Sequence, residues 1–92
     1  MTVYVIAQLK ITDRAAYDRY QARFWDVFRQ FNGRLLAADE NPSVLEGRWD
    51  GDKVVMMSFP DEQSAYAFLR SPSYREISRD RHAGAETTSL LV

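Results

Sequence analysis

The sequence predicts an α+β domain with the ferredoxin-like order βαββαβ, and three observations favour this fold. Apolar residues alternate along residues 3–11, and residues 53–59 form a short run that is apolar at both odd and even positions, as in a buried strand. A helical spacing of apolar residues occupies residues 13–31 between these strands, and further helical segments precede residues 87–92. We therefore expect one four-stranded antiparallel sheet with helices on one face, formed by residues 1–92 as a single domain.

The first strand and the first helix are predicted by different periodicities. One face of the strand at 3–11 carries every second residue: Val3, Val5, Ala7, Leu9 and Ile11. Asp13 can cap the helix that follows, over roughly residues 13–31, because its carboxylate accepts a free backbone N–H group. Asn32-Gly33 is expected to end that helix, since glycine tolerates the left-handed backbone. Trp25 lies outside the apolar stripe and is expected on the helix surface or against another subunit.

A second strand is expected at residues 34–39, after which Asn41-Pro42-Ser43 interrupts it. Residues 44–49 can resume this strand as a bent or bulged continuation. Asp50-Gly51-Asp52 is typical of a hairpin turn and leads to the third strand at 53–59.

The second half of the chain is predicted to contain two helices and a final strand. Asp61 is placed to cap a helix over residues 62–70, and Ser71-Pro72-Ser73 both ends this helix and begins the next. The third helix, over residues 73–82, has one face made of Tyr74, Ile77, Ser78 and Arg81. The last strand is expected at residues 87–92.

The strand at 53–59 has apolar side chains on both of its faces. Helices on one side of the sheet cover only one of these faces, and the chain is too short to supply helices for the other. The sequence therefore predicts a homodimer that buries the second face against another copy, which is a dimeric α/β barrel. Candidate residues of this face are Tyr4, Ile6, Leu35 or Leu36, Val54, Met56 and Leu91.

The composition argues against several classes of function. Twelve basic and thirteen acidic residues give a formal net charge of −1, so the chain has no general attraction for nucleic acid or anionic membranes. It contains no cysteine and one histidine, His82, so we expect no disulfide, no metal site and no cofactor. No segment has the length of a membrane span or the features of a signal peptide, so we expect a cytoplasmic protein.

Short motifs in a fixed order cover nearly the whole chain: Ile6-Ala7-Gln8, Asp13-x-x-x-Tyr17, Gly33-Arg34-Leu35-Leu36-Ala37, Val44-Leu45-Glu46-Gly47, Phe59-Pro60, Ser71-Pro72-x-Tyr74 and Arg81. Together they resemble the family known as domain of unknown function 1330. The resemblance implies a ferredoxin-like dimeric α/β barrel whose biochemical role is not established. Ser58 departs from the family pattern, in which an acidic residue usually precedes the Phe-Pro pair. Wider relatives include antibiotic-biosynthesis-type monooxygenases and haem-degrading and stress-responsive proteins, a likeness of fold alone.

Arg81 and Glu46 are the candidates for catalytic or anion-binding groups. Arg81 shares its helix face with Tyr74 and Ile77, and a guanidinium in apolar surroundings needs a carboxylate or an anionic ligand. It can pair with Glu46 or Asp39, reach water, or hold the carboxylate of a ligand. Glu46 can be part of a structural ion pair or an exposed strand residue; if it faces inward, it can also act as a general base with a shifted pKa.

Four aromatic residues complete the candidate ligand-binding set: Tyr17, Tyr20, Trp49 and Tyr74. The tyrosines fit the apolar core, but their hydroxyl groups can also line a cavity between helices and sheet. Trp49 is expected to pack at an edge or an interface, or to offer a stacking platform to an aromatic ligand.

Three functions are compatible with these residues. The favoured one is a homodimer that binds a small organic molecule, anionic or aromatic, between sheet and helices. The second is a cofactor-independent enzyme, an oxygenase or isomerase, in which Arg81 orients an anion and Glu46 or a tyrosine moves a proton. The third is a purely structural dimer with a filled core.

Overall fold

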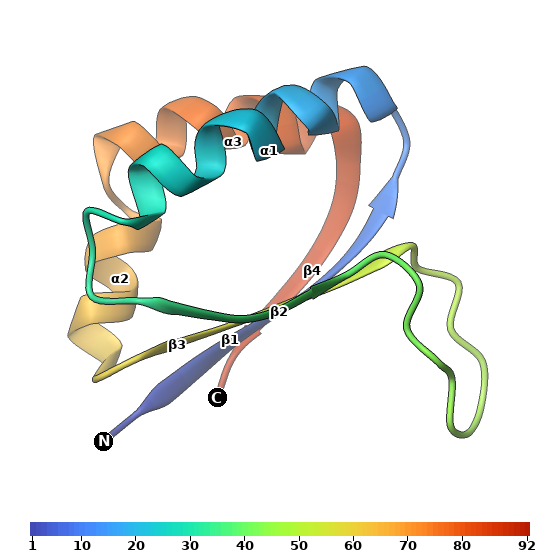
Figure 1. Cartoon of the computed structure of the whole chain (residues 1–92), viewed down its shortest axis with the longest axis horizontal. Helices are drawn as coiled ribbons and strands as arrows, with labels where there is room; N and C mark the ends of the chain where they lie inside the picture. The colour runs from blue at the N-terminus through green and yellow to red at the C-terminus, as the bar shows by residue number, and fades with distance from the viewer.

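The computed structural model describes residues 1–92 and has the predicted βαββαβ order. Its elements are β1 (Val3–Ile11), α1 (Arg14–Phe28), β2 (Arg34–Asp39), β3 (Lys53–Phe59), α2 (Glu62–Leu69), α3 (Pro72–Gly84) and β4 (Ala85–Leu91). The four strands form one antiparallel sheet in the order β2-β3-β1-β4. All three helices lie on the same face of this sheet (Figure 1). The predicted ferredoxin-like fold is therefore confirmed. No helix is long and apolar enough to cross a membrane.

The core lies between this helix-covered face and the helices. Odd-numbered residues of β1 and β3 point toward the helices, because Val5 pairs with Met57 and Val3 pairs with Phe59 across the sheet. The largest fully buried side chains are Tyr17, Phe28, Phe59, Phe68 and Ile77. Most of this group is aromatic, and Phe68 of α2 packs edge-on against Phe28 at a centroid distance of 5.2 Å.

Each helix begins at a side-chain cap that the sequence contains. Asp13, Asp61 and Ser71 accept the backbone N–H groups of Ala16, Ser64 and Tyr74, which confirms the predicted helix starts.

The predicted end of the first helix was wrong. α1 stops at Phe28, three residues before the expected end, and Gly33 does not have a left-handed backbone. Gly33 instead allows a close approach, because a Cβ atom there would lie 2.6 Å from the Phe59 ring and 2.7 Å from the Phe28 ring. Trp25 is 55% exposed on the helix surface, with its ring centroid 5.7 Å from that of Phe28.

The second strand does not resume after Asp39, contrary to the prediction. Residues 40–52, here called the arm, are irregular and extend beyond the ends of β2 and β3 (Figure 1). Pro42 lacks an N–H group for a ladder, and Gly47 has a φ of 86° that breaks an extended strand. Leu45 is 97% exposed on the arm.

The predicted hairpin turn at Asp50-Gly51-Asp52 is also wrong, because β2 has already ended at Asp39. Asp52 has another role: its carboxylate accepts the N–H of Ile11 at 2.8 Å, and its own N–H donates to the Leu9 carbonyl. The end of the arm is thereby fixed to β1.

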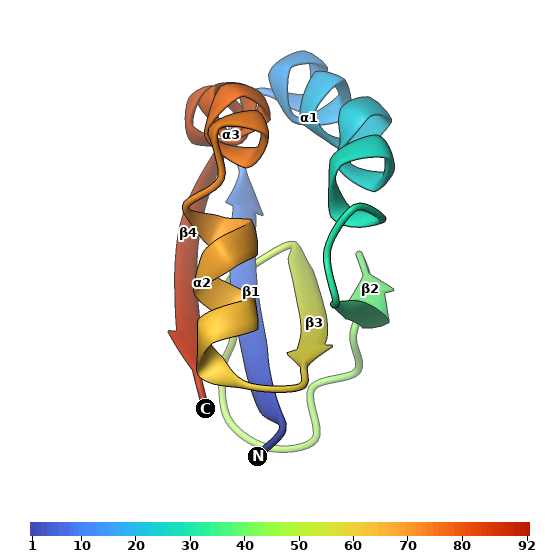
Figure 2. The ribbon, with the colours of Figure 1, turned by 90° about the vertical axis from the view of Figure 1, so that its left-hand side faces the viewer.

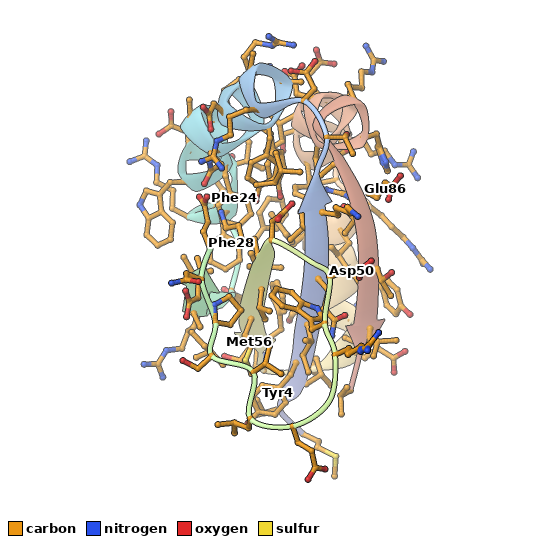
Figure 3. All side chains as sticks on the ribbon, turned by 90° about the vertical axis from the view of Figure 1, so that its right-hand side faces the viewer. Tyr4, Phe24, Phe28, Asp50, Met56 and Glu86 are labelled. Carbon is orange, nitrogen blue, oxygen red and sulfur yellow. The ribbon has the colours of Figure 1, made fainter.

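The sheet face opposite the helices, here called the free face, carries the even-numbered residues of β1 and β3. Tyr4 is 40% exposed there and Met56 is half-buried; both are labelled in Figure 3. One predicted member is corrected by the register, which pairs Val5 with Leu91 and Ile6 with Leu90. Leu91 therefore faces the helices, and Leu90, 59% exposed, lies on the free face. On β2, Leu35 pairs with Met57 and faces the helices.

Candidate functional site

A partly open cavity of about 180 Å³ lies between the sheet and the helices. Seventeen residues line it, twelve of them hydrophobic, and every helix and strand contributes at least one. α1 and α3 lie side by side at the top of the view, and α2 lies below α3 (Figure 2). The cavity is close in size to the ~150 Å³ that holds a benzene molecule in an engineered protein core.

Three of the predicted ligand-binding residues, Tyr17, Tyr20 and Tyr74, line the cavity together. The hydroxyl groups of Tyr20 and Tyr74 are 3.0 Å apart, and both side chains are buried. Burial raises the pKa of Tyr17 to about 12. Burial, followed by the nearby Tyr74 hydroxyl, raises the pKa of Tyr20 well above its ordinary value. Near neutral pH these two phenols therefore keep their protons.

Arg81 of α3 also lines the cavity, as predicted, but it has no carboxylate partner. None of the six ion pairs of the protein includes it. Its Nε atom is buried without a hydrogen-bond partner, and the buried hydroxyl of Thr87 on β4 is unpaired too. The guanidinium carbon lies 5.9 Å from the centre of the Tyr20 ring. A buried N–H group without an acceptor destabilises the protein. The surroundings of Arg81 therefore favour a ligand that supplies a hydrogen-bond acceptor.

The structure does not bring Glu46 to Arg81. Glu46 lies exposed on the arm, and Asp39, the alternative partner, is exposed at the end of β2. The Asp39 carboxylate accepts the N–H of Asn41 at 2.8 Å. The interpretation of Arg81 as half of a structural ion pair is therefore wrong, and the strand that would have turned Glu46 inward does not form.

Two further predicted residues lie away from the cavity. Trp49 is half-buried on the arm, where a Cβ atom on Gly51 would lie 2.5 Å from its ring, and it borders a shallow polar depression beside Lys10. His82 is exposed in the last turn of α3. Ser58 is buried in β3 opposite Tyr4, on the free-face side, so the acidic residue of the family pattern would not line this cavity.

Lys53, the first residue of β3, is a cavity residue that the sequence reasoning missed. It is only 6% exposed, and its Nζ donates to Gln21 Oε1 at 2.7 Å and lies 4.9 Å from the centre of the Tyr17 ring. Burial lowers the pKa of the Lys53 amine. The sequence did indicate that Lys53 faces inward, because strand alternation places residue 53 on the same side as Val55 and Met57.

The charged residues that line this cavity are all basic. Lys53 and Arg81 are its two basic residues, and no aspartate or glutamate lines it. The protein also contains no group of three or more His, Asp or Glu side chains arranged to hold a metal ion. An apolar, aromatic wall with hydroxyl donors and the unpaired guanidinium of Arg81 is suited to a small organic anion.

Solved structures similar to this chain share its fold. A protein of unknown function from Rhodopseudomonas palustris has a TM-score of 0.83 at 18% identity, over 99% of this chain and 80% of that one. A dimeric ferredoxin-like protein of unknown function from Thermobifida fusca has a TM-score of 0.72 at 13% identity, over 100% of this chain and 90% of that one. SnoaB, a cofactor-independent oxygenase from Streptomyces nogalater, has a TM-score of 0.68 at 15% identity, over 99% of this chain and 90% of that one.

Among curated proteins, none matches the sequence significantly. Residues 2–92 do match one family, described as Domain of unknown function (DUF1330), which agrees with the motifs and with the fold. This match covers almost all of the sequence. The chain therefore belongs to the DUF1330 family.

Proposed function

We propose that this protein is a homodimer in which each subunit binds a small organic anion, of the size of a single substituted ring, in the cavity between sheet and helices. The observation that carries the proposal is the pair of buried, unpaired polar atoms, Arg81 Nε and Thr87 Oγ1. Both residues line the cavity, and a carboxylate has two oxygens that can accept hydrogen bonds from such donors. The aromatic walls would hold the apolar part of the ligand.

The ligand proposal is tested by thermal unfolding with matched probes. Benzoate should raise Tm, whereas benzyl alcohol, which has the ring without the charge, should raise it much less. Saturation at a hundred times Kd stabilises the folded state by about 2.7 kcal/mol. Arg81→Gln should abolish the preference for benzoate. Arg79→Gln is the matched control, because Arg79 lies on the same helix with its side chain 81% exposed.

Two results would refute the anion site. One is an equal shift with the acid and with the alcohol. The other is a preference for benzoate that survives in a folded Arg81→Gln protein. Absence of any shift across a library of small carboxylates and phenols would favour the purely structural dimer.

The dimer is proposed from the free face of the sheet. Tyr4, Leu36 and Leu90 are large apolar residues between 40% and 59% exposed on or beside this face, more than a small monomer ordinarily leaves uncovered. The Thermobifida fusca protein of similar fold is described as dimeric. Light scattering should give twice 10.7 kDa. Leu90→Asp should give a monomer, and Ala67→Asp, at an exposed position of α2, should remain dimeric.

A second candidate function is cofactor-independent oxygenase or isomerase chemistry in the same cavity. It is supported by the likeness of fold to SnoaB and by the Tyr20–Tyr74 hydroxyl pair, which could donate a proton. Glu46 is too exposed and remote to be its base. Oxygen consumption with a phenolic substrate, lost in Tyr20→Phe, would support this candidate; a ligand that binds without turnover would exclude it for that ligand.

A further inference from the structure

Lys53 is a buried amine for which the anion site gives no role. The chain has two lysines, Lys10 and Lys53. Lys10 has a side chain that is 52% exposed, 3.8 Å from Asp50, whereas Lys53 is almost entirely removed from solvent and points into the cavity. Burying an ammonium group without a carboxylate partner costs free energy of folding, so the presence of a lysine here needs an explanation.

The contacts of Lys53 favour a neutral amine over a structural cation. No carboxylate lies within ion-pair distance, and the one hydrogen bond goes to the neutral amide oxygen of Gln21. Among the more distant charges, Glu40 and Asp18 raise its pKa and Arg14 lowers it, but burial has the largest effect and the net direction is downward. A desolvated lysine of this kind is the form that attacks carbonyl groups.

We propose that Lys53 condenses with the carbonyl group of a small aldehyde or ketone held in the cavity and forms an imine. The lone pair of Nζ attacks the carbonyl carbon, the nitrogen gives up its two protons, and the carbonyl oxygen takes up two protons and leaves as water. The C=O bond is replaced by a C=N bond, with no change of oxidation state and no other reactant. This inference rests on the proposed ligand-binding cavity and narrows its ligand to a compound with a carbonyl group.

The sheet register indicates how such a ligand would lie. Leu9 pairs with Lys53 on one side and with Thr87 on the other, and all three residues line the cavity. Adjacent strands are about 4.8 Å apart, so the backbones of Lys53 and Thr87 are about 10 Å apart across the sheet. A ring with a carbonyl group at one end and a carboxylate at the other could meet Lys53 and the Arg81–Thr87 pair at the same time.

Reductive trapping with para-carboxybenzaldehyde and sodium cyanoborohydride tests this inference on the unmodified protein. The reagent converts an imine into a stable secondary amine, which peptide mapping by mass spectrometry assigns to Lys53, Lys10 or the N-terminal amine. We expect Lys53 to be modified several-fold faster than Lys10, because the cavity holds the aldehyde beside the buried Lys53 amine. Modification of Lys53 at the rate of Lys10, or slower, would overturn the proposal.

Matched variants separate this proposal from the anion site. Lys53→Arg should lose the fast adduct and Lys10→Arg should keep it. The alcohol para-carboxybenzyl alcohol cannot form an imine but carries the same carboxylate. If it raises Tm in an Arg81-dependent manner while Lys53 is not trapped, the anion site is supported and the imine is rejected. If Lys53 is trapped rapidly and Arg81→Gln changes nothing, the imine is supported and the anion site is rejected.

Discussion

The Tyr20 hydroxyl of α1 and the Tyr74 hydroxyl of α3 form a hydrogen bond of 3.0 Å that joins the two helices over the cavity. Their rings also pack edge to face, with centroids 6.3 Å apart. The contact has two effects, because it stabilises the helix pair and places a hydroxyl pair where a ligand would bind.

We predict that the Tyr20–Tyr74 hydrogen bond contributes about 1 kcal/mol to the free energy of unfolding. Tyr20→Phe and Tyr74→Phe should each destabilise the protein, and the double variant should cost less than the sum, because each single change leaves one buried hydroxyl unpaired. Urea denaturation of the four proteins measures the coupling. Tyr66→Phe is a suitable control, since the Tyr66 hydroxyl has no hydrogen bond within the protein. Full additivity would contradict the prediction.

Stability should fall at alkaline pH because of the buried tyrosines. The pKa of Tyr17 is raised to about 12 and that of Tyr20 is also raised, so the folded state keeps these protons at a pH at which the unfolded chain releases them. The contribution is complete below pH 10, the ordinary tyrosine pKa, and is lost as pH rises from 10 toward 12. Urea midpoints between pH 8 and about 12 should fall less steeply in Tyr17→Phe than in the wild type.

Asp61 should stabilise the start of α2 at neutral pH, because its carboxylate accepts the Ser64 N–H. Its hydrogen bond to Ser64 lowers its pKa below the ordinary value of 3.8, so its contribution is present above pH 3.8 and is lost as pH falls through the lower, folded-state pKa. Asp61→Ala should therefore cost more at pH 7 than at about pH 2. Asp61→Asn keeps a capping oxygen without the titration, and its effect should vary little with pH. An Ala variant equally destabilised at both pH values would contradict this assignment.

Gly84→Ala should be among the most destabilising small substitutions, at about 1–3 kcal/mol or more. A Cβ atom there would lie 2.5 Å from the Tyr17 nitrogen and 2.9 Å from the Asp13 oxygen, which are backbone atoms of the α1 start. The Gly84 carbonyl also accepts N–H groups from Thr12 and Asp13, so a shift would break these bonds.

The control for Gly84→Ala is Ala83→Ser, a substitution at the exposed neighbouring position. Ala83→Ser should change the urea midpoint very little. Gly84→Ala as stable as Ala83→Ser would show that the packing of α3 against α1 is looser than the structure indicates.

The fold was predictable because its determinants are local. Asp13, Asp61 and Ser71 mark the three helix starts, and the short apolar run at residues 53–59 marks a central strand. The errors fall where tertiary contacts decide. Gly33 is needed for its small size against two rings, and a sequence pattern cannot distinguish this from a need for left-handed backbone.

The candidate site was predictable in part for a similar reason. Helical spacing brought Tyr74 and Arg81 to one face, and the structure has both on the cavity. Glu46 is exposed, which was one of the predicted alternatives, but it lies in no strand because the pairing of β2 with β3 ends at Asp39. Lys53 was missed because a lysine at the start of a strand is ordinarily exposed, and only the neighbouring α1 residues, Tyr17 and Gln21, bury it.

The cavity lies on the helix side of the sheet, whereas the free face lies on the other side. Two subunits joined through the opposite side of their sheets would therefore have two equivalent sites, separated by the full thickness of both sheets. Binding to such an assembly should follow a simple hyperbola, with a stoichiometry of one ligand per chain and a Hill coefficient of about one. The fraction of occupied cavities would then rise gradually with ligand concentration and show no threshold.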